Sequence, residues 1–456
     1  MKDFFKTPIE PPEQLDELAV RPIEQDATFV SNIELVLGND RVTGSLAKKV
    51  REVSQRALWY PDYEHIVLPE APDPSFAWYV GTLGLKPNIV VPDGIDPYNL
   101  SMRDAFVPHQ PGNPKEPSNF AKAIQGRMVE SFVLDQKLAS FVNYCGGTYP
   151  GGPPGDRPSQ ANNKALFADY SQGIVQVPKG KKHTGLDNVA AAVKARLAQG
   201  KDTFVRHTQS GGGFGNRSFT KQSAGKMSLA EIRSYLVGDH PESWENATVL
   251  VEEHLGRITQ SPAVTFGWTG FLYDNLQLTQ NGDYRGSISP VPPEVANARE
   301  LQYIGDAFSA SLRQKINYYG PGNVDLGLMV DRKLIGFECN ARFTGARHVI
   351  AIGELLVGPW KNWRENNDVA VSVDHFTLNR TMDFDQLYDI LDREELLATK
   401  AKPQGVVISI PPRGRVAGVH IQGKGYQNTV ALHREIVKLT GDPVANTYDN
   451  PLNFSA

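Results

Sequence analysis

At 456 residues the chain is longer than one hydrophobic core usually supports, so about two to four domains are expected. Hydrophobic residues make up 40% and charged residues 21%, as is ordinary for a soluble globular protein. The net charge of −4 gives no reason to expect nucleic acid or an anionic membrane as a partner, and no apolar run approaches the roughly 20 residues that a membrane-spanning helix needs.

The N-terminal residues and the cysteine content indicate the cellular compartment in which the protein is expected to reside. Residues 1–20 carry acids and prolines where a signal peptide needs an apolar core. Cys145 and Cys339 are the only cysteines, so neither a disulfide framework nor a cysteine zinc site is expected. Cytoplasmic residence is therefore the expectation.

Residues 1–155 are predicted to form an N-terminal α/β domain, with residues 1–30 as a proline-bearing lead-in. Short apolar runs alternate there with amphipathic stretches, which is typical of strands alternating with helices. The apolar runs are 32–38, 65–69 and 87–94, and the amphipathic stretches are 42–59 and 118–140. Residues 145–159 contain five glycines and four prolines and cannot hold a helix or a central strand, so a loop or domain boundary is predicted there.

Three further units are predicted after this boundary, at 156–256, 257–395 and 396–456. In the first, a helix at 188–200 has Asp187 as its expected N-cap and Gly200 just past its end. The other predicted elements are strands at 202–209, 247–255, 405–411 and 416–423, and helices at 293–317 and 428–441.

Residues 322–345 are the most informative stretch, because they read as two strands joined by a tight turn. Alternation puts Asp325 on one face of the first strand. On the return strand, Glu338, Asn340 and Arg342 share one face. Oxygen ligands of this kind suit Mg²⁺, which also takes waters and substrate phosphates as ligands.

The register of this hairpin decides whether its acids meet. A two-residue turn at Asp331 and Arg332 sets Asp325 directly across from Glu338, with Cβ atoms roughly 4.5–5.5 Å apart. Two carboxylates so placed destabilise a hairpin unless a cation lies between them. The turn lacks Asn-Gly, which leaves a one-residue shift in register open, and the alternative reading of this face is a solvated polar edge.

The loop SGGGFGN at 210–216 follows the predicted strand at 202–209. Glycines let backbone N–H groups approach an anion closely, because no Cβ obstructs the approach. The loop is not a Walker A motif, because Gly-Lys-Ser/Thr is missing, and it is not the dinucleotide fingerprint, which should open a helix. Taken alone it reads as a flexible hairpin, and only the order of the surrounding pieces suggests a function.

Together these pieces resemble the ATP-grasp superfamily. The match comprises Lys164 in NNKALF, Arg206 before the glycine loop, the strand VLVEEHL at 249–255, and the hairpin residues Asp325, Glu338, Asn340 and Arg342. The step from Asp325 to Glu338, with Asn340 two residues further on, is similar to that of D-alanine:D-alanine ligases. The resemblance covers about 160–350. GFGN, ECNARFTG, the α/β leader and the small C-terminal domain look most like the pheganomycin-type peptide ligases.

The resemblance implies the ATP-grasp fold, in which two α+β subdomains grip ATP. An N-terminal α/β pre-ATP-grasp domain precedes them, and a small C-terminal α+β domain follows. Arg206 stands where the family has a lysine, but a guanidinium still neutralises phosphate. The glycine loop would cover the terminal phosphates, and the end of the 249–255 strand would read adenine. The implied nucleotide-binding residues are Lys164, Arg206, Gly211, Gly212, Gly213, Gly215, Asn216, Glu252, Glu253 and Leu255.

The same resemblance assigns Asp325, Glu338 and Asn340 to two Mg²⁺ ions between the β- and γ-phosphates. Arg342 would be catalytic, stabilising charge on the transferred phosphoryl group and on an acyl phosphate. The implied reaction is attack of a carboxylate on ATP, followed by capture of the acyl phosphate by an amine, with release of ADP and phosphate. The expected partners are thus a small-molecule carboxylate and an amine, either an amino acid or a peptide. The oligomeric state is left open, although such ligases are often homodimers.

Two other functions fit the same motifs. An ATP-grasp phosphotransferase would use the metal hairpin without forming an amide. A non-catalytic ATP-binding module is supported only by the departure at Arg206, and the complete hairpin set argues against it.

Several residues outside the hairpin carry two readings each. His348 could receive the amine proton or be structural. Arg347 could pair with a substrate carboxylate or lie on the surface. The aromatic segment 264–275 could line an acceptor pocket, although a core role is favoured. Arg413 and Arg415 lie in a turn that could close over the site.

Overall fold

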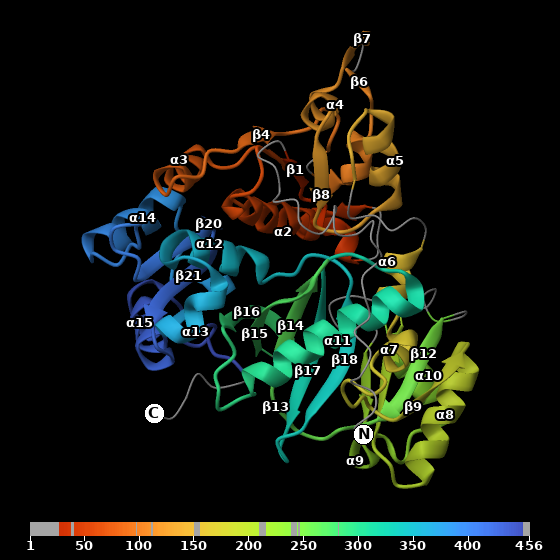
Figure 1. Ribbon diagram of the computed structural model, residues 1–456. Coiled ribbons are helices and arrows are strands. Elements are labelled where there is room, and N and C mark those ends of the chain that lie inside the picture. The colour runs from red at the N-terminus through yellow and green to blue at the C-terminus, as the bar shows by residue number, and fades with distance from the viewer. Residues whose placement is uncertain are drawn as a thin grey trace, which may run out of the picture.

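The computed structural model describes residues 27–37, 41–96, 98–110, 113–149, 156–208, 216–238, 244, 247–280 and 282–449. Its main sheets are a parallel N-terminal sheet, a small antiparallel sheet and a large antiparallel central sheet. In Figure 1 the N-terminal domain lies at the top, above the central sheet, and the small antiparallel sheet lies at lower right. Within the described ranges, no helix combines the length and the apolar character needed to cross a membrane.

The N-terminal domain is built on a parallel sheet in the order β4-β3-β1-β8. All four residues of β1 (Ala27–Val30) are buried, as expected for a parallel strand covered on both faces. The predicted α/β class of this domain is therefore confirmed. The other main elements are β3 (His65–Val67), β4 (Asn88–Val90), β8 (Met128–Ser131), α2 (Gly44–Ser54), η2 (Gln55–Trp59), α3 (Pro74–Thr82), α4 (Asn119–Ile124) and α5 (Gln136–Tyr144).

Two local predictions in this domain were wrong. The apolar run after β1 forms a 3-10 helix, η1 (Ile33–Leu37), instead of a strand, because a short apolar run fits either structure. The amphipathic stretch 118–140 is interrupted by β8. Gly126 there has a left-handed φ of 72°, which ends the helical path, and the residues that follow pair with β1.

The small antiparallel sheet has the order β11-β10-β12-β9 and its own hydrophobic core. Helix α8 begins at Leu186 and its N-cap is Gly185, so the predicted cap Asp187 lies in the first turn instead. A carboxylate there still interacts favourably with the helix dipole. The elements are β9 (Gly180–Thr184), β10 (Thr203–His207), β11 (Arg217–Phe219), β12 (Thr248–Glu253), α8 (Leu186–Ala198), α9 (Lys221–Ala224) and α10 (Leu229–Val237).

The central sheet has nine strands in the described residues, in the order β13-β17-β14-β15-β16-β19-β21-β20, with β18 paired to β17. Helix α11 (Ala298–Ile316) packs against β14 and β15 through an apolar stripe. The strands are β13 (Ile258–Gln260), β14 (Pro262–Gly267), β15 (Gly270–Gln280), β16 (Asp283–Ser289), β17 (Gly322–Met329), β18 (Leu334–Asn340), β19 (Asp368–Thr377), β20 (Gly405–Arg413) and β21 (Val416–Lys424).

The C-terminal segment continues this sheet, because β21 pairs with β19 and β20 pairs with β21. The predicted boundary at 395/396 thus falls within one sheet, and the four-part division itself stays a prediction. The Trp59 indole donates a hydrogen bond of 2.8 Å to the Ser409 carbonyl, which joins the N-terminal domain to β20. The remaining helices are α6 (Arg157–Asn162), α7 (Lys164–Tyr170), α12 (Arg347–Val357), α13 (Trp363–Asn366), α14 (Phe384–Arg393) and α15 (Tyr426–Thr440).

Candidate active site

The β17–β18 hairpin places Asp325 directly across from Glu338, and Asn323 across from Asn340. The predicted facing of the two acids is therefore confirmed, and the open one-residue shift at the acids is excluded. Asn323 shares the face of Asp325, because the two residues are separated by one position on the strand.

The predicted two-residue turn of this hairpin was wrong. Leu328 pairs with Leu334, and the Met329 N–H donates to the Lys333 carbonyl at 2.9 Å, so three residues make the turn. A bulge at Phe337 then adds one residue to the return strand and restores the register at the acids. The acids face each other because these two irregularities cancel.

Asp325 is held by three side-chain amides. Its Oδ1 accepts hydrogen bonds from Gln277 Nε2 at 2.7 Å and from Asn323 Nδ2 at 2.5 Å, and its Oδ2 accepts one from Asn340 Nδ2 at 2.8 Å. Burial, and secondly the charge of Glu338, raise the pKa of Asp325 to about 7. A cation that binds beside this buried acid stabilises its charged form.

Two cations contact or face the acid pair. Lys164 is only 6% exposed and begins α7, with its Nζ 3.2 Å from Glu338 Oε2. Its backbone N–H donates to the Thr208 carbonyl at 3.1 Å, which joins α7 to the end of β10. Arg342 follows β18, and burial lowers its pKa while the charges of Glu338 and Asp325 oppose that shift. The structure therefore brings together the predicted phosphate lysine, the predicted metal acids and the predicted catalytic arginine.

Arg206 and Glu252 are paired with each other. Arg206 Nε and Nη2 lie 2.7 Å and 2.8 Å from the two carboxylate oxygens of Glu252, and both side chains are buried. Arg206 Nη1 also donates to the Phe337 carbonyl at the bulge, at 2.5 Å. The predicted phosphate ligand thus links the small sheet to the metal hairpin.

Two further residues of the predicted nucleotide site, Glu253 and Leu255, lie at the connection between the two sheets. Glu253 ends β12, and its Oε1 accepts a hydrogen bond of 2.9 Å from the Lys179 N–H. Leu255 follows in the short segment that leads to β13. Asn216 is half-buried just before β11. The predicted phosphate-loop glycines, Gly211, Gly212, Gly213 and Gly215, lie outside the described residues.

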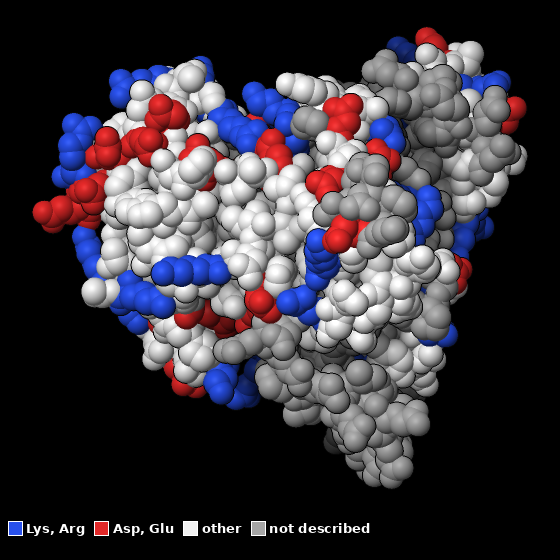
Figure 2. Space-filling view, turned by 90° about the horizontal axis from the view of Figure 1, so that it is seen from above, with Lys and Arg blue, Asp and Glu red and all other residues white. Residues whose placement is uncertain are grey.

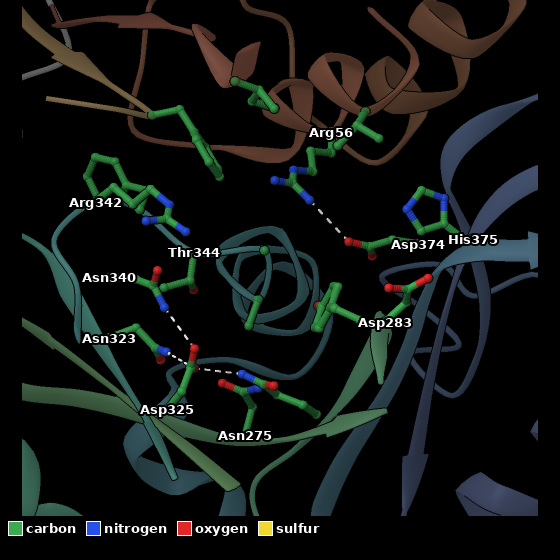
Figure 3. A pocket seen from close by; sticks show the side chains of 18 of the residues that line it. Arg56, Asn275, Asp283, Asn323, Asp325, Asn340, Arg342, Thr344, Asp374 and His375 are labelled. Atoms are coloured by element: carbon green, nitrogen blue, oxygen red, sulfur yellow. Dashed lines mark hydrogen bonds and ion pairs between the residues drawn. The ribbon is translucent and has the colours of Figure 1, made fainter. Parts of the chain in front are cut away.

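A cavity of about 440 Å³ opens beside the metal hairpin. In Figure 3, Arg342 and Asn340 enter it from the left, Asp325 from below, and Arg56 from above. Helix α2 of the N-terminal domain supplies an apolar part of the wall, and β15 supplies amide and hydroxyl groups. The described residues that line the cavity include Leu46, Val50, Val53, Arg56, Phe132, Asn275, Gln277, Thr279, Asp283, Asn323, Asp325, Glu338, Asn340, Arg342, Thr344, Asp374 and His375.

The hairpin fits Mg²⁺ only with help from other ligands. Within the described ranges, no cluster of three or more His, Cys, Asp or Glu side chains forms a metal site on its own. Asp325 and Glu338 supply carboxylate oxygens, and Asn340 supplies an amide oxygen once its NH₂ group turns away. Mg²⁺ commonly completes such a set with waters and nucleotide phosphates, so the donor set suits a metal that arrives with ATP.

Arg347 does not lie on the surface, so its surface reading was wrong, and it is not among the described residues that line the cavity. Its guanidinium is buried among aromatic rings, with Cζ 3.7 Å from the Phe343 ring centroid and 4.6 Å from that of Tyr60. Its Nη2 donates to Tyr63 Oη at 2.6 Å. The contacts of Arg347 with Tyr60 and Tyr63 therefore connect the start of α12 to the N-terminal domain.

The other residues that were given two possible roles have structural contacts. His348 is fully buried, with Nε2 3.2 Å from Asp374 Oδ1, which fits its structural reading. In the aromatic segment, Phe266 and Tyr273 are buried, so the favoured core role is confirmed for these two residues, whereas Asn275 at its end lines the cavity. Arg413 pairs with Glu70 and Arg415 with Asp442, and neither arginine is among the described residues that line the cavity.

Sequence reasoning missed the cavity residues Gln277, Thr279 and Arg56, and it included Asn275 only as the end of the aromatic segment for which a core role was favoured. Asn275, Gln277 and Thr279 alternate along β15, and this period of two is a signal that could have been read. Arg56 lies in η2 and meets Asp374, and no local pattern announces that contact.

No protein-family model matches the sequence. No curated protein matches it either. Solved structures do match. The biotin carboxylase domain of Hydrogenobacter thermophilus 2-oxoglutarate carboxylase, with MgADP, ADP and bicarbonate, is 11% identical over 91% of this chain and 90% of its own, with a TM-score of 0.56.

Two more solved structures show the same similarity. Biotin carboxylase from Campylobacter jejuni, in a β-γ-ATP complex, is 12% identical over 94% of this chain and 98% of its own, with a TM-score of 0.54. An N5-carboxyaminoimidazole ribonucleotide synthetase bound to ADP is 11% identical over 91% of this chain and 98% of its own, with a TM-score of 0.52. The chain therefore has the ATP-grasp fold with an N-terminal parallel α/β domain, and the predicted fold class is confirmed.

Proposed function

We propose that the protein is an ATP-dependent carboxylate–amine ligase that forms an amide bond through an acyl phosphate and releases ADP and phosphate. One observation carries the proposal. The facing acids Asp325 and Glu338 lie at the wall of the cavity, with Lys164 in contact with Glu338 and Arg342 lining the same space. Cations and metal-binding acids that converge in this way suit the transfer of a phosphoryl group.

Each part of the nucleotide has a place in this proposal. Lys164 and Arg206 bind the phosphates, and the connection after β12 receives adenine. Because the Glu252 carboxylate is paired with Arg206, backbone groups at Glu253 and Leu255 supply the contacts to the base. Asp325, Glu338 and Asn340 hold Mg²⁺, which neutralises charge on the phosphoryl oxygens when bound.

The reaction then needs no protein nucleophile. A carboxylate oxygen attacks the γ-phosphorus, the bond to the β-phosphate oxygen breaks, and ADP leaves. An amine nitrogen attacks the carbonyl carbon of the acyl phosphate, the C–N bond forms, and inorganic phosphate leaves as the amine loses a proton. Arg342 faces the reacting groups from the cavity wall and stabilises the oxyanions of both steps.

The cavity supports a reaction between two small organic molecules. Its volume of about 440 Å³ accommodates more than a single anion such as bicarbonate, and amide side chains line one wall. The charged groups on the face shown in Figure 2 are of both signs and interspersed, so this face offers no continuous basic field to a polyanion. The likeness to peptide ligases, with an amino acid or peptide as the amine, is part of the proposal.

An ADP-release assay tests the proposal. Amino acids, short peptides and bicarbonate are supplied in pairs with MgATP, and ADP, phosphate and product mass are measured. A ligase releases ADP only when both a carboxylate and an amine are present, whereas a phosphotransferase releases ADP with a single acceptor and yields a stable phosphorylated product.

A variant pair connects this activity to the hairpin. Glu338→Gln should abolish ADP formation while the thermal unfolding temperature stays near that of the parent, because a neutral amide holds Mg²⁺ poorly. Glu300→Gln, on the exposed start of α11, is the matched control and should keep full activity. Activity that survives in Glu338→Gln would disprove the metal assignment.

A further inference from the structure

Arg56 is a buried cation of the cavity that neither the nucleotide nor the metal site uses. Its side chain is 7% exposed and comes from η2 of the N-terminal domain. Figure 3 shows its guanidinium entering the cavity from above, on the side opposite Asp325 and Asn323. Arg56 therefore faces the part of the cavity that a second substrate would occupy.

The contacts of Arg56 leave hydrogen-bonding capacity. Nη1 lies 3.1 Å from Asp374 Oδ2, and Cζ lies 5.0 Å from the ring centroid of Phe132. Among the described residues, none accepts a hydrogen bond from Arg56 Nε. A guanidinium carries five N–H donors, and a buried donor without an acceptor is costly. His348 lies 3.2 Å from Asp374 and shares that carboxylate, so Asp374 is not devoted to Arg56 alone.

Helix α2 adds an apolar surface to the same side of the cavity. Leu46, Val50 and Val53 line the cavity and recur at the spacing of one helix face. Leu46 is 38% exposed, although its neighbours on this face are more buried. An apolar group that lies along this face would cover Leu46 and gain hydrophobic free energy.

We infer that the amine substrate is an amino acid or short peptide whose own carboxylate binds Arg56 and whose apolar side chain lies along Leu46, Val50 and Val53 of α2. This inference rests on the proposed ligase function. The carboxylate to be activated must meet the metal hairpin and Arg342, so the carboxylate at Arg56 belongs to the molecule that supplies the amine. Arg56 and α2 thus make the N-terminal domain the element that selects this substrate.

Binding to the full chain tests the inference without requiring turnover. Valine, leucine, isoleucine, methionine and phenylalanine are titrated by calorimetry in the presence of MgADP, each as the free acid and as the carboxamide. At least one free acid should bind at least about tenfold more tightly than its carboxamide, because the amide lacks the charge that Arg56 pairs with. Equal affinities for acid and amide across the panel, or no binding of any free acid, would overturn the inference.

Substitutions of Arg56 locate the effect. In Arg56→Gln the ratio of acid to amide affinity should fall close to one, and Arg56→Lys, which keeps a charge for Asp374, is a second variant that preserves folding. Arg364→Gln is the matched control, because Arg364 pairs with the buried Asp274 and is not among the described cavity residues. An acid preference that persists in both Arg56 variants, or that Arg364→Gln removes equally, contradicts the assignment.

The apolar side is tested on α2. Leu46→Asp should weaken binding of the preferred amino acid at least several-fold while glycine binding is unchanged. Ser45→Asp adds the same charge at an exposed neighbouring position that is not among the described cavity residues, and it should have no effect. Equal weakening by both substitutions would contradict a contact with Leu46.

The two hypotheses fail in different ways. If amino acids bind in an Arg56-dependent manner but ADP never forms with any carboxylate and amine, the ligase function is wrong and the binding site stands. If ADP forms with a carboxylate and an amine that Arg56→Gln uses as efficiently as the parent does, the ligase function stands and the role of Arg56 is wrong.

Discussion

The carboxylate of Asp325 gives a sharp test of the metal assignment through stability. Burial and the charge of Glu338 raise its pKa from the ordinary 3.8 to about 7. Between these two pH values the folded protein holds a proton that the unfolded chain has released. The stability of the metal-free protein therefore falls as the pH rises through that window, and the whole penalty is present above pH 7.

Asp325→Asn removes this penalty. The rise in the pKa of Asp325 to about 7 corresponds to about 4 kcal/mol, but one edge of the carboxylate faces the cavity, where water screens the charge. We therefore expect the variant to gain about 2 kcal/mol at pH 7.5 without divalent metal. For a chain of this length the gain corresponds to a rise of roughly 2 °C in Tm. At pH 4.5, close to the ordinary pKa, most of this gain should be lost.

Calorimetric unfolding at the two pH values, with and without MgADP, measures both effects of Asp325→Asn. MgADP should raise the Tm of the parent protein and raise that of the variant much less. Glu34→Gln is the matched control, because burial also raises the pKa of Glu34 to about 7 in the N-terminal domain. It should show a similar pH-dependent gain and keep the MgADP response. An Asp325→Asn protein that is no more stable than the parent at pH 7.5, or that responds fully to MgADP, would refute the reasoning.

Three other substitutions probe the surrounding contacts. Lys164→Ala should weaken ATP binding by about tenfold or more in calorimetry, and Lys333→Ala at the exposed hairpin turn should not; unchanged affinity in Lys164→Ala would remove this lysine from the site. Arg206→Lys cannot reproduce the two-point pairing with Glu252, so we expect about 1–3 kcal/mol of lost stability by thermal unfolding, and an unaltered Tm would contradict that pairing. Arg347→Met removes a cation that packs among aromatic rings, and with it the hydrogen bond to Tyr63. The variant should have a lower Tm and an unchanged KM for ATP. A changed KM would show that Arg347 acts on the site.

The acid pair of the hairpin could be predicted from the sequence. Strand alternation is a local property with a period of two, so Asp325, Glu338 and Asn340 could be assigned to faces from their spacing alone. The turn could not be predicted, because Arg332 takes a left-handed φ of 69° that no glycine or asparagine announced there. The bulge at Phe337 was equally invisible, and the register at the acids depends on it.

The sequence by itself determined which segments alternate and which polar residues share a strand face, because these features depend on neighbours a few positions apart. Only the tertiary structure decided that Arg206 pairs with Glu252 and that Arg56 meets Asp374, 318 positions away. It also showed that Arg347 does not lie on the surface but packs over the Tyr60 ring and donates to Tyr63. Such contacts form when separate sheets and helices pack together, and local spacing carries no information about which distant side chain will fill a given space.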